Sequence, residues 1–178
     1  VGSEMCIRDR SGNVHGGVIM KLVDTAGGVC SIRHARRRAV TARIDSMSFL
    51  QPVYVGDLVT LMASVNEVGR TSMEVGVRVQ AEDLITGIVR HVSSAYLVFV
   101  TLDDDGRPTP APPLIAETEA EKRRMKEAKL RRAHRQRGEE AMRALRDSAT
   151  ARASLAAGVD ALTSDYPDRV RAIEQEFR

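Results

Sequence analysis

Four runs of alternating apolar and polar residues follow one apolar helical segment, and this order restricts the fold more than any other feature of the chain. The helical segment runs from Val18 to about Arg33, with apolar residues at helical spacing. The strand-like runs cover residues 39–52, 57–68, 73–80 and 88–102, and turn residues separate them. A helix followed by four strands in meander order predicts an α+β fold with an antiparallel sheet.

Two glycines, Gly27 and Gly28, lie inside the predicted helix and lower its intrinsic helix propensity. Tertiary packing must therefore hold this helix, and a sheet that approaches it closely would do so. Aromatic residues make up only 3% of the chain and Trp is absent, which predicts an aliphatic core of β-branched strands packed on the helix.

Composition also excludes several classes of protein. The two cysteines give no disulfide framework, and no Cys/His cluster has the spacing of a metal site, so no metal and a cytoplasmic location are expected. The sequence has no apolar run long enough to cross a bilayer and no signal peptide, so neither membrane insertion nor secretion is expected.

The chain divides into four predicted segments. Residues 1–10, VGSEMCIRDR, resemble a translated sequencing adapter and are expected to replace an authentic first strand. Residues 11–115 form the predicted globular domain, and a capping box, Thr118-x-x-Glu121, begins a charged helix over 116–137. We expect Gly138 to break that helix, and residues 138–178 to form an Ala- and Arg-rich tail that is helical in pieces.

The loop before the apolar helix is the first candidate for chemistry. A helix N-terminus presents unpaired N–H groups and a positive partial charge, and Gly16 and Gly17 would let a carbonyl approach these backbone donors. Such donors stabilise the oxyanion that forms when a thioester is attacked. The loop also contains Asn13, which can orient water or bind the carbonyl, and His15, for which a structural or substrate-lining role is expected.

Asp24 is the only acidic residue on the apolar helix, and it would act as general base on water or as a nucleophile. Gly17 and Asp24 are about 10 Å apart along the helix axis at a rise of 1.5 Å per residue. One helix cannot readily supply both groups to one carbonyl, so the active form is expected to be at least a dimer. The competing interpretation is that the glycines form a plain turn, Asn13 caps the helix and Asp24 faces solvent.

Several motifs occur in the order and spacing of a known family: GNVHGGVIMKLVDTAGG, VTARIDSMSFLQPVYVGD, GRTSMEVGVRV and AYLVFVTLDDDGRP. Over about residues 12–135 the chain resembles the cytosolic-type acyl-CoA hydrolases of the hot-dog fold. The resemblance implies a sheet wrapped around a central helix, a homodimer that can form a trimer of dimers, and an interface site that uses Asn13 and Asp24. The portion beyond about Arg137 has no counterpart in that family.

CoA carries phosphate groups, and the turn formed by Arg70, Thr71 and Ser72 offers a guanidinium, two hydroxyls and backbone N–H groups to bind them. Family members place this turn near the nucleotide; a plain hairpin turn is the equal alternative. Arg90 is a weaker substrate-binding candidate. The basic helix has interleaved Glu and no aromatic residues, so nucleic-acid binding is not expected.

These features favour an acyl-CoA thioesterase that cleaves fatty acyl-CoA to CoA and free acid without a cofactor, CoA being part of the substrate. A non-catalytic acyl-CoA-binding or regulatory protein is the alternative. A hot-dog hydratase would need a His near Asp24 on the same helix, and none lies between Gly16 and Arg33, which makes this third possibility the weakest.

Overall fold

The computed structural model of the protein describes residues 12–147. The adapter-like segment and most of the predicted C-terminal tail therefore lie outside the described residues. The elements in chain order are α1 (Gly16–Ala35), β1 (Arg38–Phe49), β2 (Leu58–Val68), β3 (Ser72–Glu82), β4 (Val89–Leu102) and α2 (Glu119–Asp147). The predicted helix and the four predicted strands all occur within a few residues of their expected bounds, and α1 extends the predicted helix at both ends.

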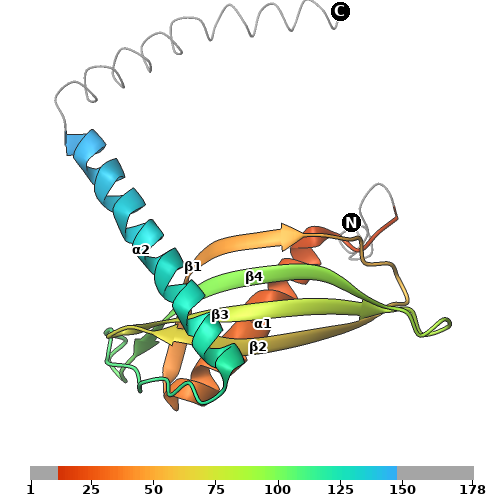
Figure 1. Cartoon of the computed structure of the whole chain (residues 1–178), viewed down its shortest axis with the longest axis horizontal. Coiled ribbons are helices and arrows are strands. Elements are labelled where there is room, and N and C mark those ends of the chain that lie inside the picture. The colour runs from red at the N-terminus through yellow and green to blue at the C-terminus, as the bar shows by residue number, and fades with distance from the viewer. Residues whose placement is uncertain (1–11, 148–178) are drawn as a thin grey trace, which may run out of the picture. The chain divides into compact units, whose positions relative to one another are not determined.

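The four strands form one antiparallel sheet in the order β1-β4-β3-β2 (Figure 1). The predicted meander is correct for β2, β3 and β4, but it is wrong for β1, which pairs with β4. The connection from β1 to β2 therefore has to pass the end of the sheet, where the backbone N–H of Val14 donates to Val53 O at 2.9 Å. As a result β1 lies at one edge of the sheet and β2 at the other.

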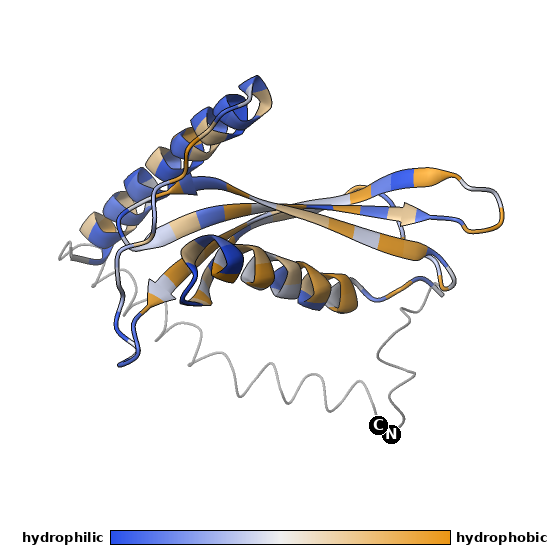
Figure 2. Ribbon diagram, turned by 90° about the horizontal axis from the view of Figure 1, so that it is seen from below, coloured by the Kyte–Doolittle hydropathy of each residue, from blue (hydrophilic) through white to orange (hydrophobic). Residues whose placement is uncertain are grey.

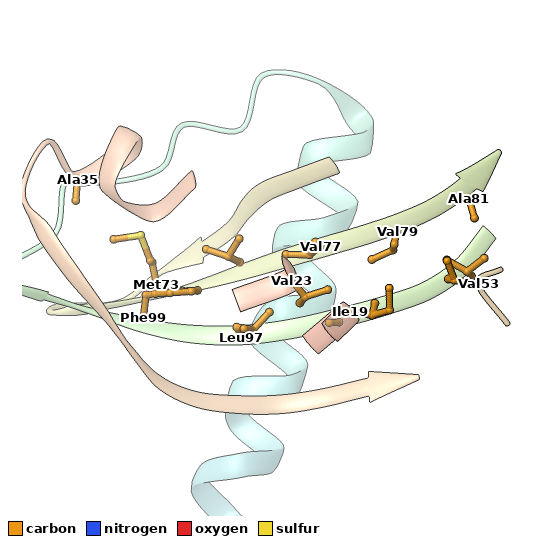
Figure 3. Close-up of a cluster of buried hydrophobic side chains, with 13 residues drawn as sticks. Ile19, Val23, Ala35, Val53, Met73, Val77, Val79, Ala81, Leu97 and Phe99 are labelled. Carbon is orange, nitrogen blue, oxygen red and sulfur yellow. The ribbon is translucent and has the colours of Figure 1, made fainter. Parts of the chain in front are cut away.

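Helix α1 packs on one face of the sheet and contacts all four strands, as Figure 2 shows from below. Side chains on a strand alternate between the two faces, so Val75, Val77 and Val79 of β3 all point toward α1. With Ile19 and Val23 of α1 they belong to a fully buried aliphatic core (Figure 3). This core matches the composition-based prediction, since Phe99 is its only aromatic member.

Gly27 sets how closely the helix approaches the sheet. A Cβ atom at this position would lie 2.9 Å from the ring of Phe99, closer than such atoms come in proteins, whereas one at Gly28 would lie at an ordinary 3.9 Å. The close approach expected from the helix glycines is therefore confirmed at Gly27.

The charged helix α2 begins at the predicted capping box. Thr118 N–H donates to Glu121 Oε2 at 2.9 Å, and Glu121 N–H donates to Thr118 Oγ1 at 3.2 Å. The helix continues through Gly138, where we expected a break, because the cost of one glycine, about 1 kcal/mol, is small beside the helix-forming residues around it. The chain separates into two compact units after Lys129, within α2.

Candidate functional site

His15 is the N-cap of α1. Its backbone is extended, and its Nδ1 accepts a hydrogen bond of 3.0 Å from the Gly17 N–H, while its carbonyl accepts from Val18 N–H at 2.9 Å. These contacts give His15 the structural role that was one of its two expected roles. They also occupy the Gly17 amide, which we expected to be an oxyanion donor, so a carbonyl could reach this amide only if the imidazole moved aside.

A cavity of about 370 Å³ lies at this end of α1. Its lining includes Asn13 and Gly16 from the loop, Ile19 from the helix and Phe49 at the end of β1. A Cβ atom at Gly16 would lie 3.4 Å from Phe49 Cζ, so the missing side chain leaves room between the helix end and the aromatic ring. The cavity thus combines apolar walls with the polar start of a helix.

Asn13 is held in this wall by backbone pairing rather than by the helix. It forms an isolated antiparallel bridge with Tyr54, in the connection between β1 and β2. The cap position belongs to His15, so the interpretation of Asn13 as the helix cap is wrong. Asn13 and Gly16 both line this cavity.

Asp24 lies in the middle of α1 and is half-buried. Its Oδ1 accepts a hydrogen bond of 2.6 Å from the Thr41 hydroxyl, which comes from the edge strand β1. A hydrogen bond to a carboxylate is short and stronger than one between neutral groups, so Thr41 fixes the orientation of the carboxylate. Sequence reasoning missed Thr41 because it is one of several polar residues in an alternating strand, and only the packing of β1 beside α1 singles it out.

The candidate residues do not all meet within one copy of the chain. Asp24 is not among the residues that line the cavity at the helix start, and about 10 Å of helix separates it from Gly17 at 1.5 Å per residue. The carboxylate and the glycine loop therefore lie apart from each other in the described part of one chain.

The turn containing Arg70, Thr71 and Ser72 lies at the other end of the sheet from the cavity. Ser72 pairs with Val100, whereas the cavity residue Ser93 lies further back on β4, about 23 Å away at roughly 3.3 Å per residue. The carbonyls of Arg70 and Thr71 accept hydrogen bonds from Ala111 and Thr101. Within a single copy, this turn cannot bind the same small group as the cavity.

Arg90 has a structural function. Its guanidinium lies 2.6 Å from Asp57 Oδ2, donates to Pro52 O at 3.2 Å and stacks over the Tyr54 ring at 4.9 Å from the ring centre. The Arg90 and Asp57 side chains are only 19% and 6% exposed. These contacts clamp the β1–β2 connection, and the role of Arg90 in substrate binding stays a prediction.

Other groups contribute little to a reactive centre. Burial raises the pKa of the Cys30 thiol, against smaller opposing effects of a Val65 backbone hydrogen bond and the Arg33 charge, so the thiol is a poor nucleophile at neutral pH. Residues 12–147 contain no group of three potential metal-ligating side chains. Neither described helix has an apolar stretch of the length that a bilayer crossing requires.

Comparisons with known proteins identify the family. The sequence profile of the Thioesterase superfamily matches residues 11–88. The chain is 41% identical over 125 residues to the protein VdlD of Helicobacter pylori, a match that covers 70% of this chain and 71% of that protein.

Two solved structures show the same architecture. An apo-hexameric acyl-CoA thioesterase is 34% identical with a TM-score of 0.72, over 77% of this chain and 86% of that one. An acyl-CoA hydrolase from Staphylococcus aureus, solved with butyryl-CoA and CoA, is 30% identical with a TM-score of 0.69, over 79% of this chain and 88% of that one. Structures of the staphylococcal enzyme also include variants with an asparagine, an aspartate or a threonine replaced by alanine. The antiparallel sheet packed on α1 is the predicted hot-dog fold, and the chain belongs to the thioesterase superfamily.

Proposed function

We propose that this protein hydrolyses the thioester bond of fatty acyl-CoA, releasing CoA and a free acid, with Asp24 as the group that acts on the acyl carbon. The observation that carries the proposal is the half-buried Asp24 carboxylate, held by Thr41 at 2.6 Å on a helix with no other acidic residue. Removing a carboxylate from water is costly, and a function explains why an apolar helix retains one. The names of the similar solved structures support acyl-CoA as the substrate.

Two mechanisms fit a carboxylate in this position. As a general base, Asp24 removes a proton from water, the water oxygen attacks the carbonyl carbon, and the tetrahedral intermediate expels the CoA thiolate, which is then protonated. As a nucleophile, Asp24 itself attacks, CoA thiolate leaves, and water hydrolyses the resulting mixed anhydride. Neither route needs a metal or other cofactor. Label found in the Asp24 side chain after a single turnover in ¹⁸O-labelled water would establish the nucleophilic route, because the general-base route places the label only in the free acid.

The oxyanion donors would come from a second copy. Gly16 is the remaining candidate for the amide donor, because the Gly17 N–H is hydrogen-bonded to His15. Within one copy of the chain, the glycine loop is too far from Asp24 for both to act on one carbonyl. The outer edge of β1 has no paired strand within residues 12–147. Exposed apolar side chains also lie on α1 and β1: Met20, Leu22, Val29, Ile32, Val40, Ile44 and Phe49. A dimer that pairs these surfaces would bring the carboxylate and the glycine loop together, and the hexameric neighbours support a trimer of such dimers.

The same assembly would bring the Arg70–Ser72 turn of one copy near the cavity of another. Within one copy this turn lies far from the cavity, but the turn of a second or third copy can approach the cavity of the first. We therefore keep Arg70, Thr71 and Ser72 as candidates for binding the phosphates of CoA across a subunit boundary. The expected compartment is the cytoplasm, since the sequence offers no disulfide framework.

The staphylococcal variants bear on which residues take part. The replaced aspartate and threonine stand 17 residues apart, the same interval as Asp24 and Thr41 here. The replaced asparagine precedes the aspartate by a longer interval than the one between Asn13 and Asp24. Counted back from Asp24, that longer interval ends at Asp9, which lies outside the described residues. These intervals support the pairing of Asp24 with Thr41 and make position 9 a rival to Asn13 for the role of the asparagine.

Residue 9 belongs to the segment that resembles a translated sequencing adapter, and for the chain as given its identity defines a second candidate function. If the asparagine is needed for turnover, an aspartate in its place would leave a protein that binds acyl-CoA and hydrolyses it poorly. A carboxylate cannot donate the hydrogen bond that an amide N–H gives to a carbonyl oxygen. This is the non-catalytic alternative raised by the sequence, now tied to one residue.

Thiol release from acyl-CoA substrates of increasing chain length tests the proposed function. We expect turnover by the full chain and a loss of about 10² to 10⁴ in rate for Asp24→Asn, the range typical of a lost general base. Asp105→Asn, at an exposed turn position, is the matched control and should retain activity. Wild-type turnover in Asp24→Asn would contradict the assigned role.

The second candidate has its own test. Acyl-CoA binding without turnover in the starting protein, together with turnover gained by Asp9→Asn, would favour the impaired binder and assign the amide role to position 9. If instead the starting protein turns over and Asn13→Ala abolishes this, Asn13 holds that role.

A further inference from the structure

A second cavity, of about 430 Å³, lies on the sheet face opposite α1. Residues 75, 77 and 79 of β3 point into the core, so the alternate residues Gly76 and Arg78 point to this other face. Arg123 and Arg124 of α2 complete the lining, and both precede the division of the chain after Lys129. The cavity is therefore separate from the Asp24 side of the sheet.

The cavity is strongly cationic. Its lining contains three guanidinium groups, from Arg78, Arg123 and Arg124, and one carboxylate, from Glu127. Arg123 Nε lies 4.0 Å from Glu127 Oε1, a distance at the limit of an ion pair, and both side chains are largely open to solvent. Among the residues that the structure describes, no carboxylate pairs with Arg78. Within the lining itself, three cationic groups therefore stand against one carboxylate.

Arg124 supplies an independent sign that an acceptor is missing. Its Nε is shielded from solvent and has no hydrogen-bond partner, the only such side-chain nitrogen or oxygen found among the described residues. Buried donors in native proteins are almost always paired, because leaving one unpaired is costly. An anion bound in the cavity would offer the oxygen that this N–H lacks.

Asn66 forms the floor of the cavity, and its position depends on specific neighbouring residues. A β-bulge between Val65 and Glu67 places Asn66 on this face, where it is only 2% exposed. Its Oδ1 accepts from the Ser64 hydroxyl at 3.1 Å. A Cβ atom at position 76 would lie 2.6 Å from Asn66 Nδ2, so the amide occupies space that only glycine leaves open. Ser64 and Tyr96 add hydroxyl groups to the lining.

We propose that this cavity binds a small phosphorylated ligand at a site distinct from the acyl carbonyl. Guanidinium groups bind phosphate oxygens through paired hydrogen bonds, and three of them around one cavity suit an anion with several oxygens and more than one charge. The volume suits a small molecule rather than a macromolecule. The phosphates can belong to CoA or to a separate phosphorylated compound, and both share this chemistry.

Titration calorimetry of the full chain with sodium pyrophosphate, at constant ionic strength, tests the proposal. We expect saturable binding that weakens at least tenfold in Arg78→Gln and in Arg124→Gln. Arg107→Gln, an exposed arginine outside the cavity, removes the same charge and should bind as the starting protein does. Arg78→Gln changes only a strand residue, so it remains informative if Arg124→Gln unfolds, which a thermal melt of each variant would show.

Adding CoA during the titration identifies the source of the phosphate. Loss of pyrophosphate binding in saturating CoA assigns the cavity to the phosphates of CoA, whereas undiminished binding assigns it to another phosphorylated molecule. The proposal is overturned if pyrophosphate does not bind, or if it binds equally to Arg78→Gln. It is also overturned if Arg78→Gln alters only the mass of the assembly in solution, because the cavity would then be a contact between copies. None of these results depends on thioester hydrolysis.

Discussion

Thr41 Oγ1 lies 2.6 Å from Asp24 Oδ1 and so ties the edge strand β1 to the central helix. This bond places the proposed reactive group under the control of a residue 17 positions later in the chain. It also places that group beside the β1 edge of the sheet, where the proposed second copy would pair.

Removing the Thr41 hydroxyl should lower activity while leaving the fold intact. Hydrogen bonds to charged groups contribute about 1.5–3 kcal/mol, so we expect Thr41→Ala to reduce kcat by about ten- to a hundredfold. Thr41→Ser keeps a hydroxyl and should recover most of the rate. Thr60→Ala, at another exposed strand position, is the control. Steady-state kinetics would contradict the positioning role if Thr41→Ala and Thr60→Ala behave alike.

The contact between Gly27 and Phe99 predicts opposite effects for two neighbouring glycines. Gly27→Ala would force its methyl group against the Phe99 ring and should destabilise the protein by about 1–3 kcal/mol, as overpacked cores do. Gly28→Ala meets only an ordinary contact and should be neutral or stabilising by up to about 1 kcal/mol. Urea unfolding of the two variants measures the difference. Equal effects would mean that helix and sheet are farther apart than described.

Breaking the clamp on the β1–β2 connection should be costly. Asp57→Ala leaves the mostly buried Arg90 guanidinium without its carboxylate partner, with only the Pro52 carbonyl as acceptor, and losing one member of a buried pair typically costs about 3–5 kcal/mol. Lys122→Gln removes one member of an exposed pair with Glu119 and should change the unfolding free energy by less than about 1 kcal/mol. Chemical denaturation of both variants provides the comparison. A small effect of Asp57→Ala would mean that solvent reaches Arg90.

The capping box makes the stability of α2 depend on pH. Backbone N–H groups, first that of Thr118 and then that of Glu117, lower the pKa of Glu121 in the folded protein. The carboxylate therefore contributes stability above its unfolded pKa of about 4.5, and this contribution is lost as the pH falls toward and through the lower folded value. Glu121→Gln keeps a side-chain oxygen that can accept the Thr118 N–H hydrogen bond, but the glutamine does not titrate. We expect the difference in unfolding free energy between the starting protein and Glu121→Gln to shrink as the pH falls from about 6 to about 3. Chemical denaturation at each pH would measure this difference. A difference that stays constant over this range would contradict the prediction.

Local patterns predicted the elements well, because they depend on neighbouring residues. Alternation in residues 73–80 marks β3, and Thr118 with Glu121 marks the start of α2. The pairing of β1 with β4 has no local sequence signal, because β1 would bury the same alternating face whether it paired with β2 or with β4. Likewise the sequence pattern suggested Asn13 as the helix cap, and only the backbone geometry of the loop places His15 at that position.

The candidate site was predictable only in part for the same reason. Asp24 stands out because it is the one acidic residue on an apolar helix, a property visible in the sequence. Thr41 and the structural function of Arg90 depend on which segments become neighbours across the sheet. The cationic cavity depends on a β-bulge at Asn66, which alternation rules cannot place.

Strand β3 gives consecutive residues to two surfaces, Val77 to the core beneath α1 and Arg78 to the opposite cavity. Inserting or deleting a single residue in this strand would invert every side chain beyond it. Valines would then be turned out to water and the arginine inward to the helix. We therefore expect functional homologues to have no insertions or deletions within β3. Substitutions that change the residues of only one face are expected to be tolerated.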